Sequence, residues 1–228
     1  MIILIFVISL FSSLSCEIVE KDEILTLTPS IDSRTLVLID LDNTVMRPKT
    51  MLGSAQHIWF ETLAMAEKEG ISIQEAKEKA GEEWNRLQPY LEMIPTDPFL
   101  PDWISLLQRR GVYIFGITRR PPELENVTRE QLKSIGVAFA PNEILFCGGC
   151  TNKSENLKQF LIGLVFEKMI FIDDVPSNVT DMEQFANELE IDYLGVRYSR
   201  EDQWVESYDP KVIEDEKESF LKKHPSVL

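Results

Sequence analysis

A short apolar run that ends in two carboxylates most constrains how this chain folds. Residues 35–39 are Thr-Leu-Val-Leu-Ile, and Asp40-Leu41-Asp42-Asn43-Thr44 follows directly. An apolar run of this length is typical of a strand buried on both faces, as in a parallel sheet covered by helices. Ligands of such sheets bind at the carboxyl ends of the strands. The sequence therefore predicts Asp40 and Asp42 at a binding edge.

Apolar segments and helical patterns alternate along the rest of the chain. Strands are predicted at 112–117, 144–146, 169–172 and 193–197, and helices at 99–110, 128–135, 153–161 and 177–189. The second helix begins at a capping box, in which Gln131 follows Thr128 by three residues. Residues 17–34 are expected to form an ordered lead-in or a short helix. This alternation predicts an α/β protein with a three-layer, Rossmann-like parallel sheet.

An insert interrupts the alternation immediately after the acidic motif. Two helices are predicted within residues 51–92, at 54–69 and 72–88, and Pro89 ends the second. Ala76, Ala80 and Trp84 fall on one stripe of that helix. We therefore expect a helical hairpin inserted after the strand that ends at Asp40, within a single domain of residues 17–228.

Charge limits the classes of partner. The chain has 38 acidic and 23 basic residues and a net charge of −15. Such a surface repels nucleic acid and anionic membranes, so we expect no nucleic-acid partner. An anionic substrate would need a cation and local hydrogen-bond donors to neutralise its site.

The first residues have the composition of an export signal. Residues 1–15 contain no charged side chain, and Ser13 and Ser15 form a small-x-small pattern suited to cleavage before Cys16. The stretch is short for a membrane span. We expect a cleaved signal, a periplasmic or secreted protein, and no membrane span in the mature chain. A lipid anchor on Cys16 and an uncleaved N-terminal anchor are the alternatives, because no Lys or Arg precedes Lys21.

Cys147 and Cys150 form a C-x-x-C pair. In an exported protein a disulfide within this loop is favoured. Plain thiols are the alternative. A redox role is disfavoured, because the pair does not open a thioredoxin-like strand–helix unit, and a zinc site would need a second pair of ligands.

Four polar sites follow predicted strands or open predicted helices, and together they resemble the motifs of the haloacid dehalogenase superfamily of phosphatases and phosphotransferases. The Asp-x-Asp-x-Thr motif is matched by Asp40, Asp42 and Thr44. The remaining motifs are matched by Thr118 after a strand, Lys153 at a helix start, and the pair Asp173 and Asp174 after a strand. The resemblance covers roughly residues 35–197 and implies that family's fold, with the helical insert as a small cap over the site.

The resemblance and the chemistry of phosphoryl transfer assign the catalytic roles. Asp40 is the expected nucleophile, which forms an aspartyl phosphate. Asp42 is the expected general acid and then general base. Thr118 would donate its hydroxyl to a phosphoryl oxygen. Lys153 would supply a fixed positive charge and lower the pKa of Asp40.

Binding roles fall to the neighbouring polar groups. Mg²⁺ would be held by Asp40, the main-chain carbonyl of Asp42 and Asp174, with Asp173 as an indirect or water-bridged partner. Contacts to the substrate phosphate are expected from three further residues, namely Asn43, Arg119 and Arg120. For the two arginines the alternative is a role as solvated loop charges.

The sequence thus predicts a Mg²⁺-dependent phosphohydrolase that acts on a small phosphomonoester. The alternatives are a catalytically weak binding protein on the same fold, a phosphotransferase and a carbon–halogen hydrolase. Asp42 disfavours the last, because cleavage of a carbon–halogen bond needs no proton donor at that position. The physiological substrate and the oligomeric state are left open.

Overall fold

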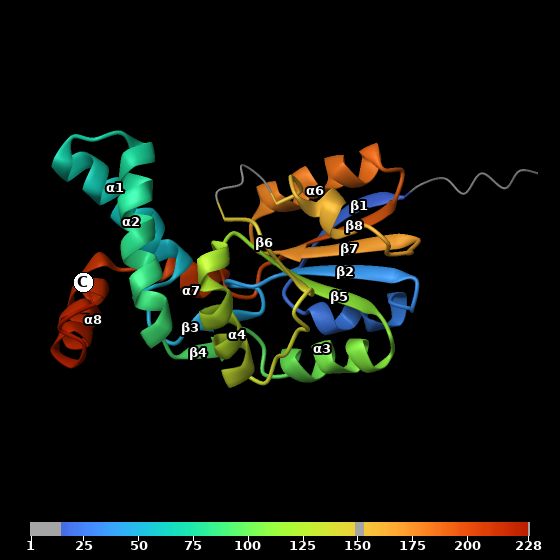
Figure 1. The fold of residues 1–228 in the computed structure, drawn as a ribbon, viewed down its shortest axis with the longest axis horizontal. Helices are drawn as coiled ribbons and strands as arrows, with labels where there is room; N and C mark the ends of the chain where they lie inside the picture. The colour runs from blue at the N-terminus through green and yellow to red at the C-terminus, as the bar shows by residue number, and fades with distance from the viewer. Residues whose placement is uncertain (1–14, 149–152, 228) are drawn as a thin grey trace, which may run out of the picture.

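The computed structural model describes residues 15–148 and 153–227, and its centre is a six-stranded parallel sheet. The strand order is β1-β8-β7-β2-β5-β6, and every neighbouring pair is parallel. The strands are β1 (Cys16–Lys21), β2 (Thr35–Asp40), β5 (Tyr113–Thr118), β6 (Ile144–Phe146), β7 (Lys168–Asp173) and β8 (Asp192–Tyr198). Helices cover both faces of the sheet (Figure 1). The predicted α/β, three-layer architecture is confirmed.

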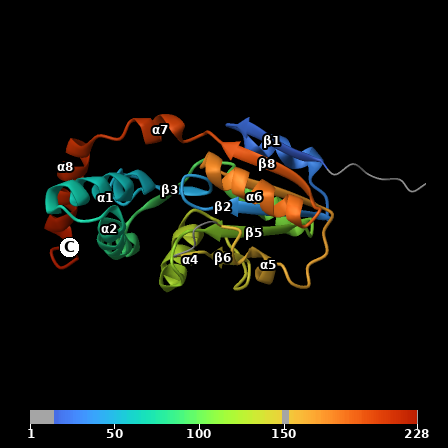
Figure 2. The same ribbon diagram turned by 90° about the horizontal axis from the view of Figure 1, so that it is seen from above.

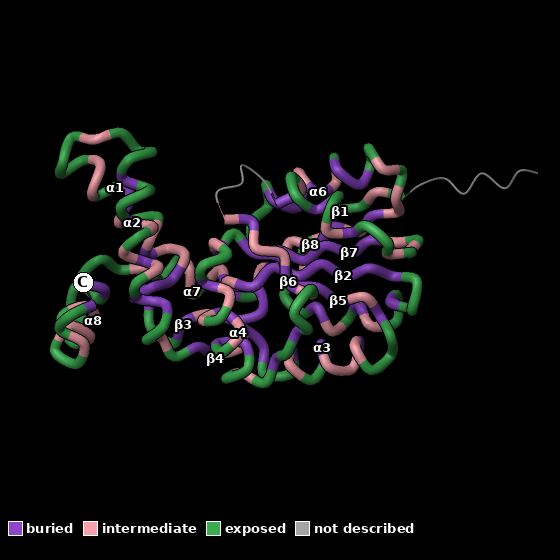
Figure 3. The backbone as a smooth tube through the Cα atoms, in the orientation of Figure 1, coloured by how far each residue is buried: buried purple, intermediate pink, exposed green. Residues whose placement is uncertain are grey.

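Alternating side chains of the central strand β2 supply two separate cores. Val37 and Ile39 belong to a core that also contains Leu100 and Trp103 of α3 (Leu100–Arg109) and residues of the 3-10 helix η1 (Ile24–Ser30). Leu36 and Leu38 point to the other face, where α6 (Pro176–Glu188) packs. The opposite placement of α3 and α6 is clear in Figure 1, and Figure 3 shows the buried strands between them.

The prediction for residues 17–34 was wrong in one respect. This segment contains the edge strand β1, which pairs with β8 from Cys16 to Lys21, before η1 begins. The strand has only one neighbour, and its side chains are mostly exposed or half-buried. Because three of its six residues are charged, the segment lacks the apolar run that identifies the central strands.

Two helix starts also differ from the prediction. Helix α4 runs from Glu125 to Ser134, so Thr128 lies inside it and caps nothing. The predicted capping box is therefore wrong. Helix α5 covers only Leu157–Phe160, and Lys153 stands in a turn before it. The helices predicted at 99–110 and 177–189 are confirmed within a residue or so as α3 and α6.

The insert after β2 contains the two predicted helices, α1 (Ala55–Glu69) and α2 (Ile73–Leu87). The Ser54 and Ser72 side chains accept N-terminal capping bonds from the main chain of the two helices. A two-stranded antiparallel ribbon that the sequence analysis missed, β3 (Met46–Pro48) and β4 (Met93–Pro95), joins the insert to the sheet. We call residues 51–92 the helical insert.

The C-terminal segment returns to the helical insert. After β8 come α7 (Asp202–Glu206) and α8 (Pro210–Lys223), and Figures 1 and 2 show α8 beside α1 and α2. Ile213 of α8 shares a small core with Leu52 and Leu87 of the insert. The Tyr208 ring stacks on Phe60 with centroids 4.2 Å apart. Among the described residues, no helix is long and apolar enough to cross a membrane.

Candidate functional site

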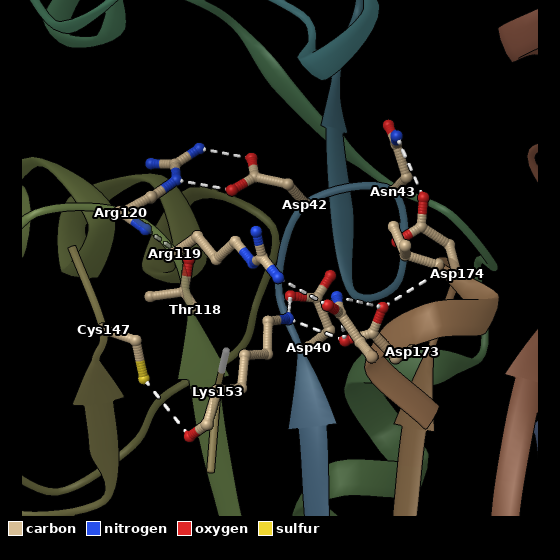
Figure 4. Close-up of polar contacts among 12 residues, drawn as sticks. Asp40, Asp42, Asn43, Thr118, Arg119, Arg120, Cys147, Lys153, Asp173 and Asp174 are labelled. Carbon is tan, nitrogen blue, oxygen red and sulfur yellow. Dashed lines mark hydrogen bonds and ion pairs between the residues drawn. The ribbon is translucent and has the colours of Figure 1, made fainter. Parts of the chain in front are cut away.

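The candidate site lies at the carboxyl edge of the sheet, where β2 is flanked by β5 and β7. Asp40, Thr118 and Asp173 are the last residues of these three strands. The chain order reverses here, since β5 lies on one side of β2 and β7 on the other. Such a switch point is the usual binding crevice of an open parallel sheet. Figure 4 shows the side chains that gather there.

Three carboxylates converge at this point. Asp40, Asp173 and Asp174 each offer an oxygen, and these oxygens lie within 4.8 Å of one another. Asp40 and Asp173 are buried. The main-chain amide of Val175 donates to Asp173 Oδ1 at 2.8 Å, and the side-chain amide of Asn178 donates to the same oxygen at 3.0 Å. The start of α6 therefore holds Asp173 in a fixed orientation.

The Lys153 ammonium is buried between two of these acids. Its Nζ donates to Asp40 Oδ1 and, at 2.7 Å, to Asp173 Oδ2. Burial alone would lower the pKa of Lys153, but the charges of Asp173 and Asp40 outweigh burial and raise it. Lys153 is therefore a permanent cation within the acidic cluster, although it comes from a turn and not from a helix start.

The pKa of Asp40 differs in direction from the expectation. Lys153 lowers it, as predicted, but burial has the larger effect and the nearby carboxylates add to burial, so the pKa stands well above the ordinary value. Burial and the charge of Asp173 likewise raise the pKa of Asp174 to about 7. The cluster thus contains three carboxyl groups and one ammonium.

Asn43 contributes to the cluster through an acid. It has a left-handed backbone with φ of 61°, a conformation that Asn tolerates better than most residues. Its side-chain amide donates to Asp174 Oδ2 at 3.3 Å. The predicted contact between Asn43 and a phosphate stays a prediction.

Asp42 faces away from the acidic cluster and is bound by Arg120 (Figure 4). Arg120 Nε and Nη2 donate to the two carboxylate oxygens of Asp42 at 2.8 and 2.7 Å. The guanidinium is buried, and its Nη1 donates to Thr128 and Gln131 of α4. From the sequence, Arg120 was expected to be a phosphate contact or a solvated charge. The solvated reading is wrong, and the Thr128/Gln131 pair is part of the Arg120 site.

Arg119 and Thr118 lie nearer to the acids. Arg119 is exposed at the mouth of the site, and its Nη2 donates to Asn178 Oδ1 at 2.8 Å. The Thr118 hydroxyl is buried and accepts from the Arg120 amide at 3.1 Å. Of the predicted site residues, Asp40, Asp173 and Asp174 thus form one cluster that Lys153 and Asn43 contact directly, and Arg119 approaches it through Asn178.

Two predictions concern residues outside the described ranges. Of the predicted signal at residues 1–15, only Ser15 is described. Cys150 of the C-x-x-C pair also lies outside these ranges. Its partner Cys147 is buried, and its thiol donates to the Lys153 carbonyl at 3.8 Å. Cys16 begins β1, and its thiol donates to Asn187 at 3.0 Å. The disulfide and the lipid anchor stay predictions.

The sequence of the chain matches one family model over most of its length. The model described as "Protein of unknown function (DUF2608)" matches residues 16–145 and 141–223. The chain belongs to this family. The matched residues include every member of the acidic cluster, as well as Lys153 and the Arg120–Asp42 pair.

Curated relatives of this DUF2608 chain come from chlamydiae. A protein of Chlamydia pneumoniae named "Putative outer membrane protein" is 24% identical over 210 residues, which cover 78% of this chain and 76% of the relative. A protein of the same name from Chlamydia muridarum is 25% identical over 193 residues, or 77% of this chain and 73% of the relative. The match extends over most of each protein.

Two solved structures have a similar chain trace at low identity. The class C acid phosphatase of Bacillus anthracis is 15% identical, covers 89% of this chain and 83% of its own, and has a TM-score of 0.43. A "putative beta-phosphoglucomutase" of Thermotoga maritima is 16% identical, with coverages of 81% and 99% and a TM-score of 0.44.

Proposed function

We propose that the protein is a Mg²⁺-dependent phosphohydrolase of the haloacid dehalogenase type, which cleaves a small phosphomonoester through an aspartyl phosphate on Asp40. The observation that carries the proposal is the convergence of Asp40, Asp173 and Asp174 on the Lys153 ammonium at a switch point of a parallel sheet. Phosphoryl transfer requires positioning and neutralisation of negative charge, and this cluster is suited to both.

The donor set fits Mg²⁺. Carboxylate and carbonyl oxygens are the ligands that Mg²⁺ prefers. Three carboxylate oxygens lie within 4.8 Å of one another, and the Lys153 ammonium contacts two of the three acids. Asp40, Asp174 and the main-chain carbonyl of Asp42 would hold Mg²⁺, with Asp173 as an additional partner. The bound ion would neutralise the charge that spreads over the phosphoryl oxygens.

Asp40 would act as the nucleophile. One carboxylate oxygen would form a bond to phosphorus while the bond from phosphorus to the leaving oxygen breaks, and Asp42 would donate a proton to that oxygen. Water would then attack phosphorus, with Asp42 as the acceptor of its proton, and release phosphate and free Asp40. Lys153 holds Asp40 in place, because its ammonium contacts the carboxylate directly.

Proton transfer by Asp42 requires a change of partner. Both of its oxygens accept hydrogen bonds from Arg120, and a carboxyl group that donates a proton must release one of them. A phosphoryl oxygen is a suitable new acceptor for the guanidinium. Arg120 would thus contact phosphate, as the sequence analysis expected, at the moment when Asp42 becomes free to serve as the acid. Thr118, Arg119 and Asn43 would complete the phosphate contacts.

The names of the chlamydial relatives support a location outside the cytoplasm. The absence of charged side chains from residues 1–15, which is typical of an export signal, supports the same location. We therefore place the proposed reaction in the periplasm or outside the cell, on a small phosphorylated substrate.

Substitution of Asp40 by Asn tests the reaction. Hydrolysis of p-nitrophenyl phosphate with added Mg²⁺ should be abolished, because an amide is a poor nucleophile, while the circular dichroism spectrum stays that of the wild type. The matched control is Asp192→Asn, because Asp192 begins β8 at the opposite edge of the sheet. Undiminished turnover by the Asp40 variant would rule out the aspartyl phosphate.

A further inference from the structure

Gln131 of α4 bridges the Arg120–Asp42 pair and the helical insert. It is buried, and its side-chain oxygen accepts from Arg120 Nη1 at 2.5 Å. Its side-chain nitrogen donates to the main-chain carbonyl of Gln88 at 2.7 Å. Both ends of one amide are thus occupied, one by the arginine that holds Asp42 and one by the residue directly after α2.

The insert side of this bridge is firmly anchored. Gln88 is completely buried, and its side-chain nitrogen donates to the Gly53 carbonyl at 3.1 Å. Trp84, one turn earlier in α2, places its ring over the Arg120 guanidinium, with 5.4 Å from the guanidinium carbon to the ring centroid. The end of α2 therefore contacts Arg120 directly through Trp84 and indirectly through Gln131.

The surrounding contact between α4 and the insert is open. An open pocket of about 390 Å³ lies between them, and its lining includes Pro89 and Leu91 of the insert and Asn126, Val127 and Gln131 of α4. Beside this pocket, the two hydrogen bonds of Gln131 link Arg120 to Gln88.

We infer that Gln131 is a positioning residue that couples the helical insert to the general acid Asp42; this inference rests on the proposed function. Arg120 directs two N–H groups to Asp42, and its remaining Nη1 is held by Gln131 and Thr128. The guanidinium is planar, so an acceptor at Nη1 fixes the direction of the pair of N–H groups. A displacement of Gln88 therefore moves Gln131, Arg120 and the Asp42 carboxyl together. Proton donation then depends on where the insert lies over the substrate.

Leaving-group dependence tests this role, because loss of a positioned acid harms only substrates that need a proton. In Gln131→Met, kcat/KM for a simple alkyl phosphate should fall by about tenfold or more, which is part of what a general acid contributes. For p-nitrophenyl phosphate, whose leaving group needs no proton, the loss should stay below about threefold. The ratio of the two rates does not depend on the folded fraction of the sample.

Two further variants sharpen the test. Gln131→Glu keeps an oxygen for Arg120 but loses the donor to Gln88, and it should shift the ratio in the same direction. Glu130→Gln, the adjacent exposed residue on α4, is the matched control and should leave the ratio unchanged. Equal losses on both esters in the Gln131 variants, or no loss, would overturn the inference.

Failure of the proposed function gives a different result. Wild-type protein that hydrolyses neither ester would refute the phosphohydrolase proposal. The positional link is then read without turnover, from the Arg120 Nε–H resonance in a ¹H–¹⁵N spectrum, assigned with Arg120→Lys. It should shift in Gln131→Met and remain in place in Glu130→Gln. An unchanged resonance in Gln131→Met would overturn the inference.

Discussion

The Lys153 ammonium donates to Asp173 at 2.7 Å in a fully buried setting, and it contacts Asp40 on its other side. Two acids from neighbouring strands are thus held together by one cation from a turn far along the chain. The ion pair serves folding and, on the proposed mechanism, catalysis. Removal of the cation would leave two buried carboxylates uncompensated.

We expect Lys153→Met to be both unstable and inactive. Loss of one partner of a buried ion pair lowers the free energy of unfolding by about 3–5 kcal/mol, because the remaining charge is left unpaired. Urea unfolding and p-nitrophenyl phosphate turnover measure the two effects. Lys158→Met is the control, since Lys158 is exposed and its loss should change stability by less than about 0.5 kcal/mol. Comparable losses in both variants would show that position 153 has no special role.

Asp174 provides the test of the metal site. Asp174→Asn should weaken Mg²⁺ binding by about tenfold or more, because one charged oxygen ligand is lost. Isothermal titration calorimetry measures this directly and needs no substrate. Asp181→Asn is the matched control, because Asp181 lies on α6 outside the acidic cluster. If both variants bind Mg²⁺ as the wild type does, Asp174 is no ligand.

The strands and the acidic cluster were predictable because their signals are local. Apolar runs define β2, β5 and β7, and parallel pairing brings their carboxyl ends to one edge. Asp40, Thr118 and Asp173 could therefore be grouped from the sequence alone. Lys153 was selected by its place in the motif order, although the helix expected to begin there begins at Leu157.

The partner of Asp42 could not be predicted in the same way. Arg120, Thr128 and Gln131 come from a loop and a helix, and nothing in their spacing shows that a buried guanidinium joins them to Asp42. The pattern Thr128 to Gln131 reads as a helix cap because both roles use the same residue types at the same separation. Only the folded structure shows that Thr128 and Gln131 bind Arg120 and do not cap the helix.

The C-terminal helix was likewise missed because its role depends on distant residues.

A pair of adjacent residues on α8 tests its packing on the insert. Ile213 is 5% exposed and its neighbour Val212 is 44% exposed. Ile213→Ala should lower the free energy of unfolding by about 2–4 kcal/mol through loss of buried surface and the remaining cavity. Val212→Ala should change it by less than about 0.5 kcal/mol. Equal values from urea unfolding would mean that α8 does not pack on the insert through Ile213.

His57 makes the stability of the insert depend on pH. The side chain is buried in α1, and its Nδ1 accepts from the Gly53 amide at 3.0 Å. Burial, with a smaller contribution from Lys217, lowers its pKa from 6.5 to about 4. Between pH values equal to these two pKa values, His57 is protonated in the unfolded chain and neutral in the folded protein. Acidification through this interval therefore favours unfolding, and above about pH 6.5 the effect is absent.

Replacement of His57 by Asn isolates this contribution. The Asn Oδ1 can take the place of Nδ1 as the acceptor for the Gly53 amide, and it does not titrate. From about pH 7 to about pH 4 the wild type should lose up to about 3 kcal/mol more unfolding free energy than the variant, the equivalent of the pKa difference. Urea unfolding at several pH values measures both proteins, and carboxylates common to the two cancel in the difference. Parallel curves for the two proteins would show that His57 is not held neutral by burial, whatever their absolute stabilities.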